Sequence, residues 1–212
     1  MIDKTNSVSI MTNNIVSKTR AVIIMPRTGL SKEEIIEKAA ALANEKGLSY
    51  LTVTTLSEYL GIKKPSLYNH VKTIDDVHYK LMIYGWKKVS EEIVTGIDSG
   101  DPNENLKIFG RAFYRFAIEN PGVFEAMLWY NKYSDDSLLE ATEGLYSFFF
   151  EQTDGLDIDR KVANHLLRTY RAFIEGFIML QIHNSFGNPI SVDESFEISI
   201  NVLISGLEQY RR

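Results

Sequence analysis

Residues 53–72, VTTLSEYLGIKKPSLYNHVK, decide the fold of this chain. Gly61 and Pro65 divide the stretch into a helix over 53–60, a short turn and a second helix over about 65–71. Glycine commonly ends a helix, and proline is tolerated in the first turn of the next one. Two short helices joined by such a turn are typical of a helix-turn-helix motif.

The apolar residues of this stretch predict how the two helices pack together. Their spacing places an apolar side of each helix against the other, with Ile62 in the turn between them. The Tyr68 ring has two interpretations, because an amphipathic ring can be buried with only its hydroxyl outside or can be exposed. The expected core residues are Leu56, Leu60, Ile62, Leu67 and Val71.

The other side of the second helix is basic and polar. Residues 61–72 contain three lysines and one histidine but no acidic residue. Lysines bind DNA phosphates through counterion release, whereas Asn, Ser and Lys can hydrogen-bond base edges in the major groove. This face therefore indicates double-stranded DNA as a partner. The outward candidates are Lys63, Lys64, Ser66, Tyr68, Asn69, His70 and Lys72.

The rest of the chain also predicts helices. A capping box of Ser31 and Glu34 begins a helix over about 31–46, and an acidic pair opens a long helix over about 75–95. No alternating run is long enough for a strand, so we expect an all-α fold. Further helices are expected over about 103–119, 122–131, 135–152, 158–185 and 191–211.

Composition limits the classes of protein that this chain can represent. The 212 residues (24.2 kDa) suffice for one or two domains with a sizeable core. The absence of cysteine excludes disulfides, thiolate zinc sites and cysteine nucleophiles, and four scattered histidines predict no metal site. No apolar run is long enough to cross a bilayer, and residues 1–24 lack the features of a signal peptide. We therefore expect a cytoplasmic protein without a membrane partner.

Charged and aromatic residues are unevenly distributed along the chain. Residues 1–80 carry 11 Lys and Arg against 8 Asp and Glu, whereas residues 81–212 carry 12 against 20. All eleven Phe lie between Phe109 and Phe196. This division indicates two modules with different tasks. The polar, aperiodic start of the chain predicts a flexible N-terminal arm over residues 1–28.

Residues 31–81 resemble the DNA-binding domain of the TetR repressor family. The match includes the capped first helix, the turn at Gly47 and the opening of the second helix at Thr52. Above all it includes residues 64–72, KPSLYNHVK, which are close to the family's recognition-helix pattern. Family members often carry Lys or Arg at the start of the fourth helix, where this chain has Ile74. The phosphate contact of that position is therefore absent or replaced by a backbone amide.

The resemblance implies roles for the matching positions. Thr52 and Thr54 fall where the second helix approaches phosphate, and Lys72 falls at another phosphate position. Lys63 is either a nonspecific phosphate contact or solvated, and His70 either contacts phosphate or caps its helix. The base- and backbone-contacting face of the recognition helix comprises Lys64, Pro65, Ser66, Tyr68, Asn69 and His70.

The resemblance also implies an architecture and a mechanism. We expect a three-helix DNA-binding domain (29–74), joined by a long helix to a helical ligand-binding and dimerisation domain (75–212). The last two helices carry long apolar stripes that a single chain would struggle to cover, which predicts a homodimer. Such a dimer would present two recognition helices to a palindromic operator. A small, largely apolar effector would release this repressor from DNA.

Aromatic residues in the second domain are the candidates for a ligand cavity. Their helical spacing also fits plain core packing, and this alternative stays open. The segment 168–209 is similar to one of the family's C-terminal subtypes. That subtype often carries a His-Gly pair, and this chain has Glu175 and Gly176 in its place. The candidate ligand-binding residues are Phe113, Phe116, Trp129, Tyr130, Phe173 and Phe177.

Enzyme signatures are missing from the sequence. It has no G-x-S-x-G, H-E-x-x-H, Walker or dinucleotide-binding motif, and the pair Asp75 and His78 alone is too little for a di-metal bundle. We therefore expect no enzyme, no cofactor and no catalytic residue. Two other classes stay open: a helical protein-interaction module with a vestigial helix-turn-helix, and an all-helical enzyme with its site in the C-terminal domain.

Overall fold

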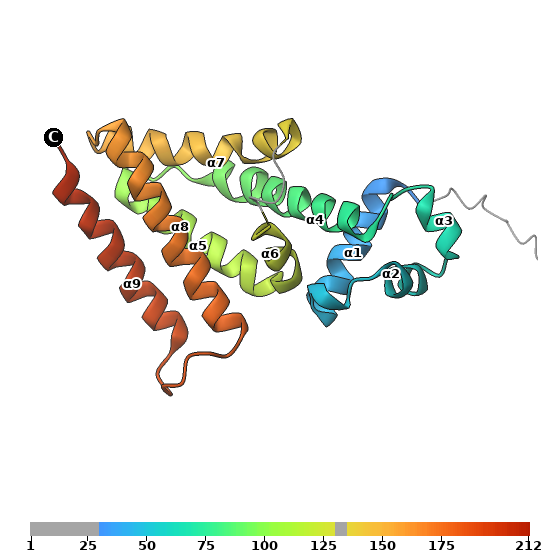
Figure 1. Cartoon of the computed structure of the whole chain (residues 1–212). Helices are drawn as coiled ribbons and strands as arrows, with labels where there is room; N and C mark the ends of the chain where they lie inside the picture. The colour runs from blue at the N-terminus through green and yellow to red at the C-terminus, as the bar shows by residue number, and fades with distance from the viewer. Residues whose placement is uncertain (1–29, 130–134) are drawn as a thin grey trace, which may run out of the picture.

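Helices make up the regular structure of this chain (Figure 1). The computed structural model describes residues 30–129 and 135–212, and over these ranges its only β-type pairing is an isolated bridge between Ile158 and Arg211. The expected all-α fold is therefore confirmed. The arm expected over residues 1–28 lies outside the described residues. In the described part of the chain, no helix combines the length and apolar character needed to cross a membrane.

The helices follow one another in the expected order, with bounds that differ from the sequence-based ones by a few residues. They are α1 (Lys32–Lys46), η1 (Leu48–Tyr50), α2 (Val53–Leu60), α3 (Lys64–Tyr68), α4 (Ile74–Lys88), η2 (Val89–Ile93), η3 (Val94–Gly96), α5 (Pro102–Glu119), α6 (Pro121–Met127), α7 (Asp136–Gly155), α8 (Arg160–Ile182), α9 (Val192–Leu207) and η5 (Glu208–Tyr210).

Helix α3 is shorter than expected and ends at Tyr68 rather than residue 71. The amides of His70 and Val71 both donate to the Leu67 carbonyl, at 2.9 and 3.1 Å, and these bonds form a turn after the helix. The chain then enters α4, whose first amides are capped by the Thr73 hydroxyl, which accepts from the Asp76 amide. A new N-cap so soon after α3 leaves no room for another helical turn.

The long fourth helix changes its winding before it ends. It is α-helical to Lys88, continues as a π-helical turn over Val89–Ile93 and closes with a 3₁₀ turn over Val94–Gly96. The last helix was expected to reach residue 211, but α9 ends at Leu207 and only a 3₁₀ turn follows.

Figure 1 shows how these helices are arranged in space. Helices α1, α2 and α3 form one end of the molecule, and α4 runs from this end into a larger body formed by α5 to α9. Helix α9 lies at the outer edge beside α8, and the C-terminus lies far from α3.

Local hydrogen bonds explain why the first helices begin and end where they do. Ser31 and Glu34 form the expected capping box at α1, and Thr52 forms an equivalent one with Thr55 at α2. Gly61 ends α2 with φ +65° and ψ 29°, a left-handed conformation that glycine adopts without steric cost. The turn that separates α2 from α3 is therefore fixed by residue type.

Helix α6 joins the N-terminal helices to the body through a contact without spare room. A Cβ on Gly122 would lie 2.2 Å from the carbonyl carbon and oxygen of Ala43 in α1. Beside this contact, the Asn44 side-chain amide donates to the Asn120 Oδ1 at 2.9 Å, and the Asn44 Oδ1 accepts from the Val123 amide at 3.0 Å. The start of α6 is thus fixed to α1 by both packing and hydrogen bonds.

The apolar stripes of α8 and α9 are largely covered within one chain. Tyr170, Phe196, Ile200 and Leu207 are buried, because α5 packs against both helices and α7 packs against α8. The expectation that a single chain would struggle to cover these stripes is therefore wrong for these four residues, whereas Val162, Leu166, Phe173, Phe177 and Leu203 are only partly buried. Leu180 is 47% exposed.

Replacing Gly122 by Ala should destabilise the protein. The added methyl group has backbone atoms of α1 in its place, so we expect a loss of about 1–3 kcal/mol in the free energy of unfolding, measured by urea denaturation. Gly96→Ala is the control, because no atom lies within 4 Å of that position, and it should change stability by about 0.5 kcal/mol or less. Equal effects of the two substitutions would contradict the close packing of α6 on α1.

Candidate functional site

The residues predicted to contact DNA lie on the surface of the helix-turn-helix domain. Lys63, Lys64, Pro65, Ser66, Asn69 and Lys72 are exposed, as are Thr52 and Thr54 on α2. The open question about Tyr68 is answered by the structure, because its side chain is 54% exposed and does not belong to the core. His70 is half-buried at the turn after α3.

Two apolar residues determine which way α3 faces. Leu67 is completely buried and Val71 is 3% exposed, and both join Leu56 of α2 in the core. Because the apolar side of this short segment is used in packing, its polar residues must point to the solvent. This packing confirms the core assignment of Leu56, Leu67 and Val71, whereas Leu60 and Ile62 are partly buried against that core.

The turn between α3 and α4 is held by one carboxylate. Asp76 accepts a 2.9 Å hydrogen bond from the Lys72 amide and forms a 2.9 Å ion pair with Lys80. Partial burial disfavours the charged carboxylate, but these two interactions outweigh it, so the pKa of Asp76 lies below its ordinary value. The Lys72 backbone is thereby fixed, while its ammonium group remains in the solvent.

Ile74 lies at the position where members of the resembled family often carry Lys or Arg, and here it has a structural role. Its side chain is partly buried and packs against the core at the first turn of α4. A phosphate contact from this side chain is therefore excluded by its chemistry.

The α3 surface combines the groups that a DNA duplex requires. Its cations can replace counterions along the phosphates, and the exposed amide of Asn69 can reach a base edge. Thr52 and Thr54 differ in availability, since the Thr52 hydroxyl is engaged in the capping box of α2. Thr54 is exposed, and its hydroxyl has no hydrogen bond within residues 30–129 and 135–212.

A largely apolar cavity lies between α4, α5, α7 and α8 in the body. It offers about 60 Å³ to the centres of water-sized molecules. At roughly 10–15 Å³ for each water position, this is room for a few such molecules or one small ring. The wall residues are Trp86, Phe109, Phe113, Thr142, Leu145, Tyr146, Phe148, Phe149, Leu167, Tyr170, Arg171, Ile174 and Glu175.

Several polar groups of this wall already have partners. The Thr142 hydroxyl donates to the Leu138 carbonyl at 2.9 Å, and the Tyr170 hydroxyl donates to the Leu106 carbonyl. Burial raises the pKa of Tyr170, which therefore stays a neutral donor. Arg171 and Glu175 form an ion pair at 2.9 Å. The cavity thus favours a ligand that needs few hydrogen bonds.

The six aromatic residues proposed as ligand contacts do not come together. Phe113 lines the cavity, whereas Phe116, Phe173 and Phe177 do not. Phe173 stacks on Phe196 of α9 at a centroid distance of 5.8 Å, and Phe177 meets the same ring edge to face at 5.2 Å, so both pack between helices. Helical spacing alone could not distinguish residues that line the cavity from residues that pack between helices. Trp129 lines a different cavity near α6, and Tyr130 lies outside the described residues.

Sequence reasoning missed most of the cavity wall. The run Phe148–Phe150 was a visible signal, but only Phe148 and Phe149 reach the cavity. Trp86 was not among the candidates, and its ring stacks on Phe113 at a centroid distance of 6.1 Å. Within the part of the chain that the structure describes, no group of three or more His, Asp or Glu residues could hold a metal ion.

Known proteins resemble this chain in both sequence and fold. Residues 106–203 match a family model described as "Tetracyclin repressor-like, C-terminal domain". The chain is 28% identical over 188 residues to the HTH-type transcriptional regulator YobS of Bacillus subtilis (strain 168), a match that covers 86% of this chain and 95% of YobS. It is 26% identical over 185 residues to the HTH-type regulator Rv0681 of Mycobacterium tuberculosis, covering 85% and 83% of the two chains.

One solved structure extends the comparison to the fold. A single-substitution variant of TetR from Acinetobacter baumannii AYE, in complex with minocycline, superposes with a TM-score of 0.67 and 20% identity. The match covers 87% of this chain and 99% of that one. YobS and Rv0681 are both described as HTH-type transcriptional regulators.

Proposed function

We propose that this chain, which belongs to the TetR family of transcriptional regulators, is a repressor that binds a palindromic operator as a homodimer and is released by a small, largely apolar effector. The observation that carries the proposal is the exposed polar face of α3, which has three cations beside it and no acidic residue between 61 and 72. The effector and dimer parts are supported by the cavity and by the outer face of α8 and α9, respectively.

The DNA contacts divide into two kinds. Lys64, Ser66 and Asn69 supply donors and acceptors for base edges, and these specify sequence. Thr54, Lys63 and Lys72 supply phosphate contacts, which position the helix without reading sequence. Lys72 is suited to this role because its backbone is fixed by Asp76.

Replacing Lys64 or Asn69 by Ala should weaken binding to the operator by about 1–3 kcal/mol, because each substitution removes a base contact. Fluorescence anisotropy with a palindromic operator fragment measures the loss. Lys87→Ala is the matched control, since Lys87 is an exposed cation at the far end of α4, and it should leave the affinity unchanged.

Salt dependence separates this function from that of a protein-interaction module with a vestigial helix-turn-helix. Phosphate contacts make the logarithm of the DNA affinity fall linearly with the logarithm of the salt concentration. DNA binding that does not depend on salt would count against the α3 surface as the DNA contact. Equal operator affinity of the Lys64, Asn69 and Lys87 variants would count against it as well.

The dimer proposal rests on side chains that the chain itself leaves uncovered. On α9, Ile198 and Val202 are 60% and 68% exposed, and on α8 Leu180 is 47% exposed. Gly176 lies one helical turn before Leu180 and has no atom within 4 Å of its Cβ position. Small and apolar residues on two adjacent helices allow close approach of a second copy. A two-fold dimer would place its recognition helices in successive major grooves, about 34–36 Å apart.

Val202→Glu should convert the dimer into a monomer, because it places a charge in the interface. Light scattering should then give half the mass of the unmodified protein, and operator affinity should fall as well. Leu139→Glu is the control, since Leu139 is 63% exposed on α7, away from α8 and α9, and it should preserve the dimer. A monomeric unmodified protein at working concentration would remove this part of the proposal.

The cavity is placed where a ligand can affect the DNA-binding end. Trp86 forms part of its wall and belongs to α4, whose first turns pack on α1. The neighbouring Gly85 lies against α6, so closely that a Cβ there would be 2.6 Å from the Met127 sulfur. An effector that binds one position of α4 better than another would therefore shift the spacing of the two recognition helices.

Leu145→Trp should abolish the effector response without weakening DNA binding, because the larger side chain fills a cavity with little free volume. Uncharged single-ring compounds such as phenol and toluene serve as probes, with release of the operator as the measurement. Leu139→Trp is the control on the same helix, outside the cavity wall. A probe that releases the operator from Leu145→Trp as well as from Leu139→Trp does not act through this cavity.

A further inference from the structure

A second cavity lies where the helix-turn-helix end meets the body. Its wall is formed by η1, α4, the end of α6 and α8. This cavity is more open to the solvent than the first one, and it offers about 320 Å³ to the centres of water-sized molecules, compared with about 60 Å³ in the first cavity. Pockets with several hundred Å³ of room are typical of small-molecule sites. The apolar part of this wall comes from Leu48, Leu128 and Met179.

The wall also contains a carboxylate without a counterion. Glu125 of α6 is half-buried at this cavity, and within residues 30–129 and 135–212 it has neither an ion pair nor a side-chain hydrogen bond. A positive charge that enters the cavity would be attracted to this carboxylate, because no cation of the described residues pairs with it. The cavity wall has no lysine or arginine from the described residues to occupy that place.

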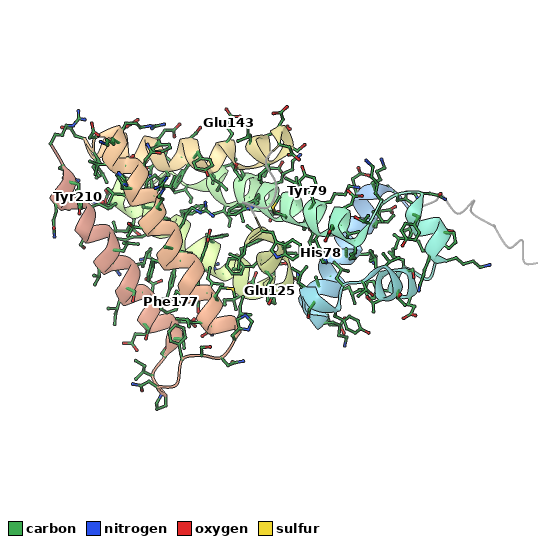
Figure 2. All side chains as sticks on the ribbon, in the orientation of Figure 1. His78, Tyr79, Glu125, Glu143, Phe177 and Tyr210 are labelled. Carbon is green, nitrogen blue, oxygen red and sulfur yellow. The ribbon has the colours of Figure 1, made fainter. Side chains whose placement is uncertain are left out.

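An indole ring lies in the same wall. Trp129 follows α6 and meets the His78 ring of α4 edge to face, with a centroid distance of 5.0 Å and an angle of 88°. His78 and Glu125 line this one cavity, and Figure 2 shows both at the junction between the two ends of the molecule. Indole is the best of the aromatic rings for binding an organic cation over its face.

We propose that this junction cavity binds an organic cation that carries an apolar group, with its positive charge at Glu125 and Trp129 and its apolar part against Leu48, Leu128 and Met179. The cation class follows from the unpaired carboxylate beside the indole, and the apolar group follows from the rest of the wall. An anion of the same shape would be repelled by Glu125, the one carboxylate among the described wall residues, whose other polar members are Ser49 and His78.

The position of this cavity gives its ligand a consequence for regulation, which rests on the proposed function. Leu48 and Ser49 belong to η1 in the DNA-binding end, whereas Glu125 and Met179 belong to the body. A bound cation would therefore contact both parts and favour one orientation between them. The first cavity, between α4, α5, α7 and α8, has no wall residue from α1, η1, α2 or α3.

Benzyltrimethylammonium is the probe for this site. Its affinity is compared with the affinities of neutral benzyl alcohol and anionic benzoate. All three are measured at pH 8, where an ordinary histidine is neutral. The chain contains two tryptophans, so Trp86→Phe leaves Trp129 as the only indole and makes its fluorescence report on the junction cavity. The cation should bind roughly tenfold more tightly than the alcohol, and benzoate more weakly than either.

Glu125→Gln keeps the shape of the side chain and removes its charge, so it should weaken binding of the cation by roughly tenfold and leave the alcohol unaffected. Glu143→Gln is the matched control. Glu143 is exposed on α7, also without an ion pair in the described part of the chain, and Figure 2 shows it away from the junction.

Equal affinity for the cation and the alcohol, or an unchanged affinity in Glu125→Gln, would overturn the proposal, as would no binding at millimolar concentrations. These measurements contain no DNA, so they stand or fall independently of the repressor function. Adding the operator then tests the regulatory consequence: the cation should change operator affinity in the unmodified protein and not in Glu125→Gln.

Discussion

Helix α4 belongs to two packing units at once, and the rest of the structure depends on this sharing. It packs against α1 and buries Val77 and Leu81 in its first half, while Trp86, farther along, lines the first cavity. Between them, Gly85 allows α6 to approach without a gap. Because close-packed interiors do not deform continuously, the proposed effector would act on the DNA-binding end through this shared helix.

Helix α6 supplies a second connection between the same two parts. It packs on α4, and its first turn is bonded to Asn44 of α1. The two connections together fix the direction in which α3 points relative to α8 and α9. In a dimer this direction sets the distance between recognition helices, and therefore the spacing of the half-sites that the protein can bind. The junction cavity lies beside this second connection, with Glu125 on α6 itself.

The sequence predicted the features that depend on local interactions. The capping box at Ser31, the start of α2 at Thr52 and the glycine after α2 are determined by residues three or four positions apart, so pattern alone located them. The outward face of α3 was also predictable, because its few apolar residues had to be its buried side. The end of α3 was misplaced because the Thr73 cap of the next helix competes with its last turn.

The cavity walls could not be derived in the same way. Phe113 and Phe116 share one helix and similar spacing, yet only Phe113 meets the cavity, since α5 is in contact with several other helices. The stripe on α9 predicted an uncovered face, but α5 covers it and leaves Ile198 and Val202 outside instead. Such assignments depend on long-range packing, which residue spacing does not encode.

The most direct test of the central claim, that α3 reads DNA as one of a symmetric pair, is to recover genomic fragments bound by the purified protein and to map its contacts by hydroxyl-radical footprinting. The account predicts palindromic sites with two protected backbone segments about one helical turn apart, and the loss of this protection with Asn69→Ala. Fragments without shared sequence or symmetry, or a footprint unchanged by that substitution, would contradict it.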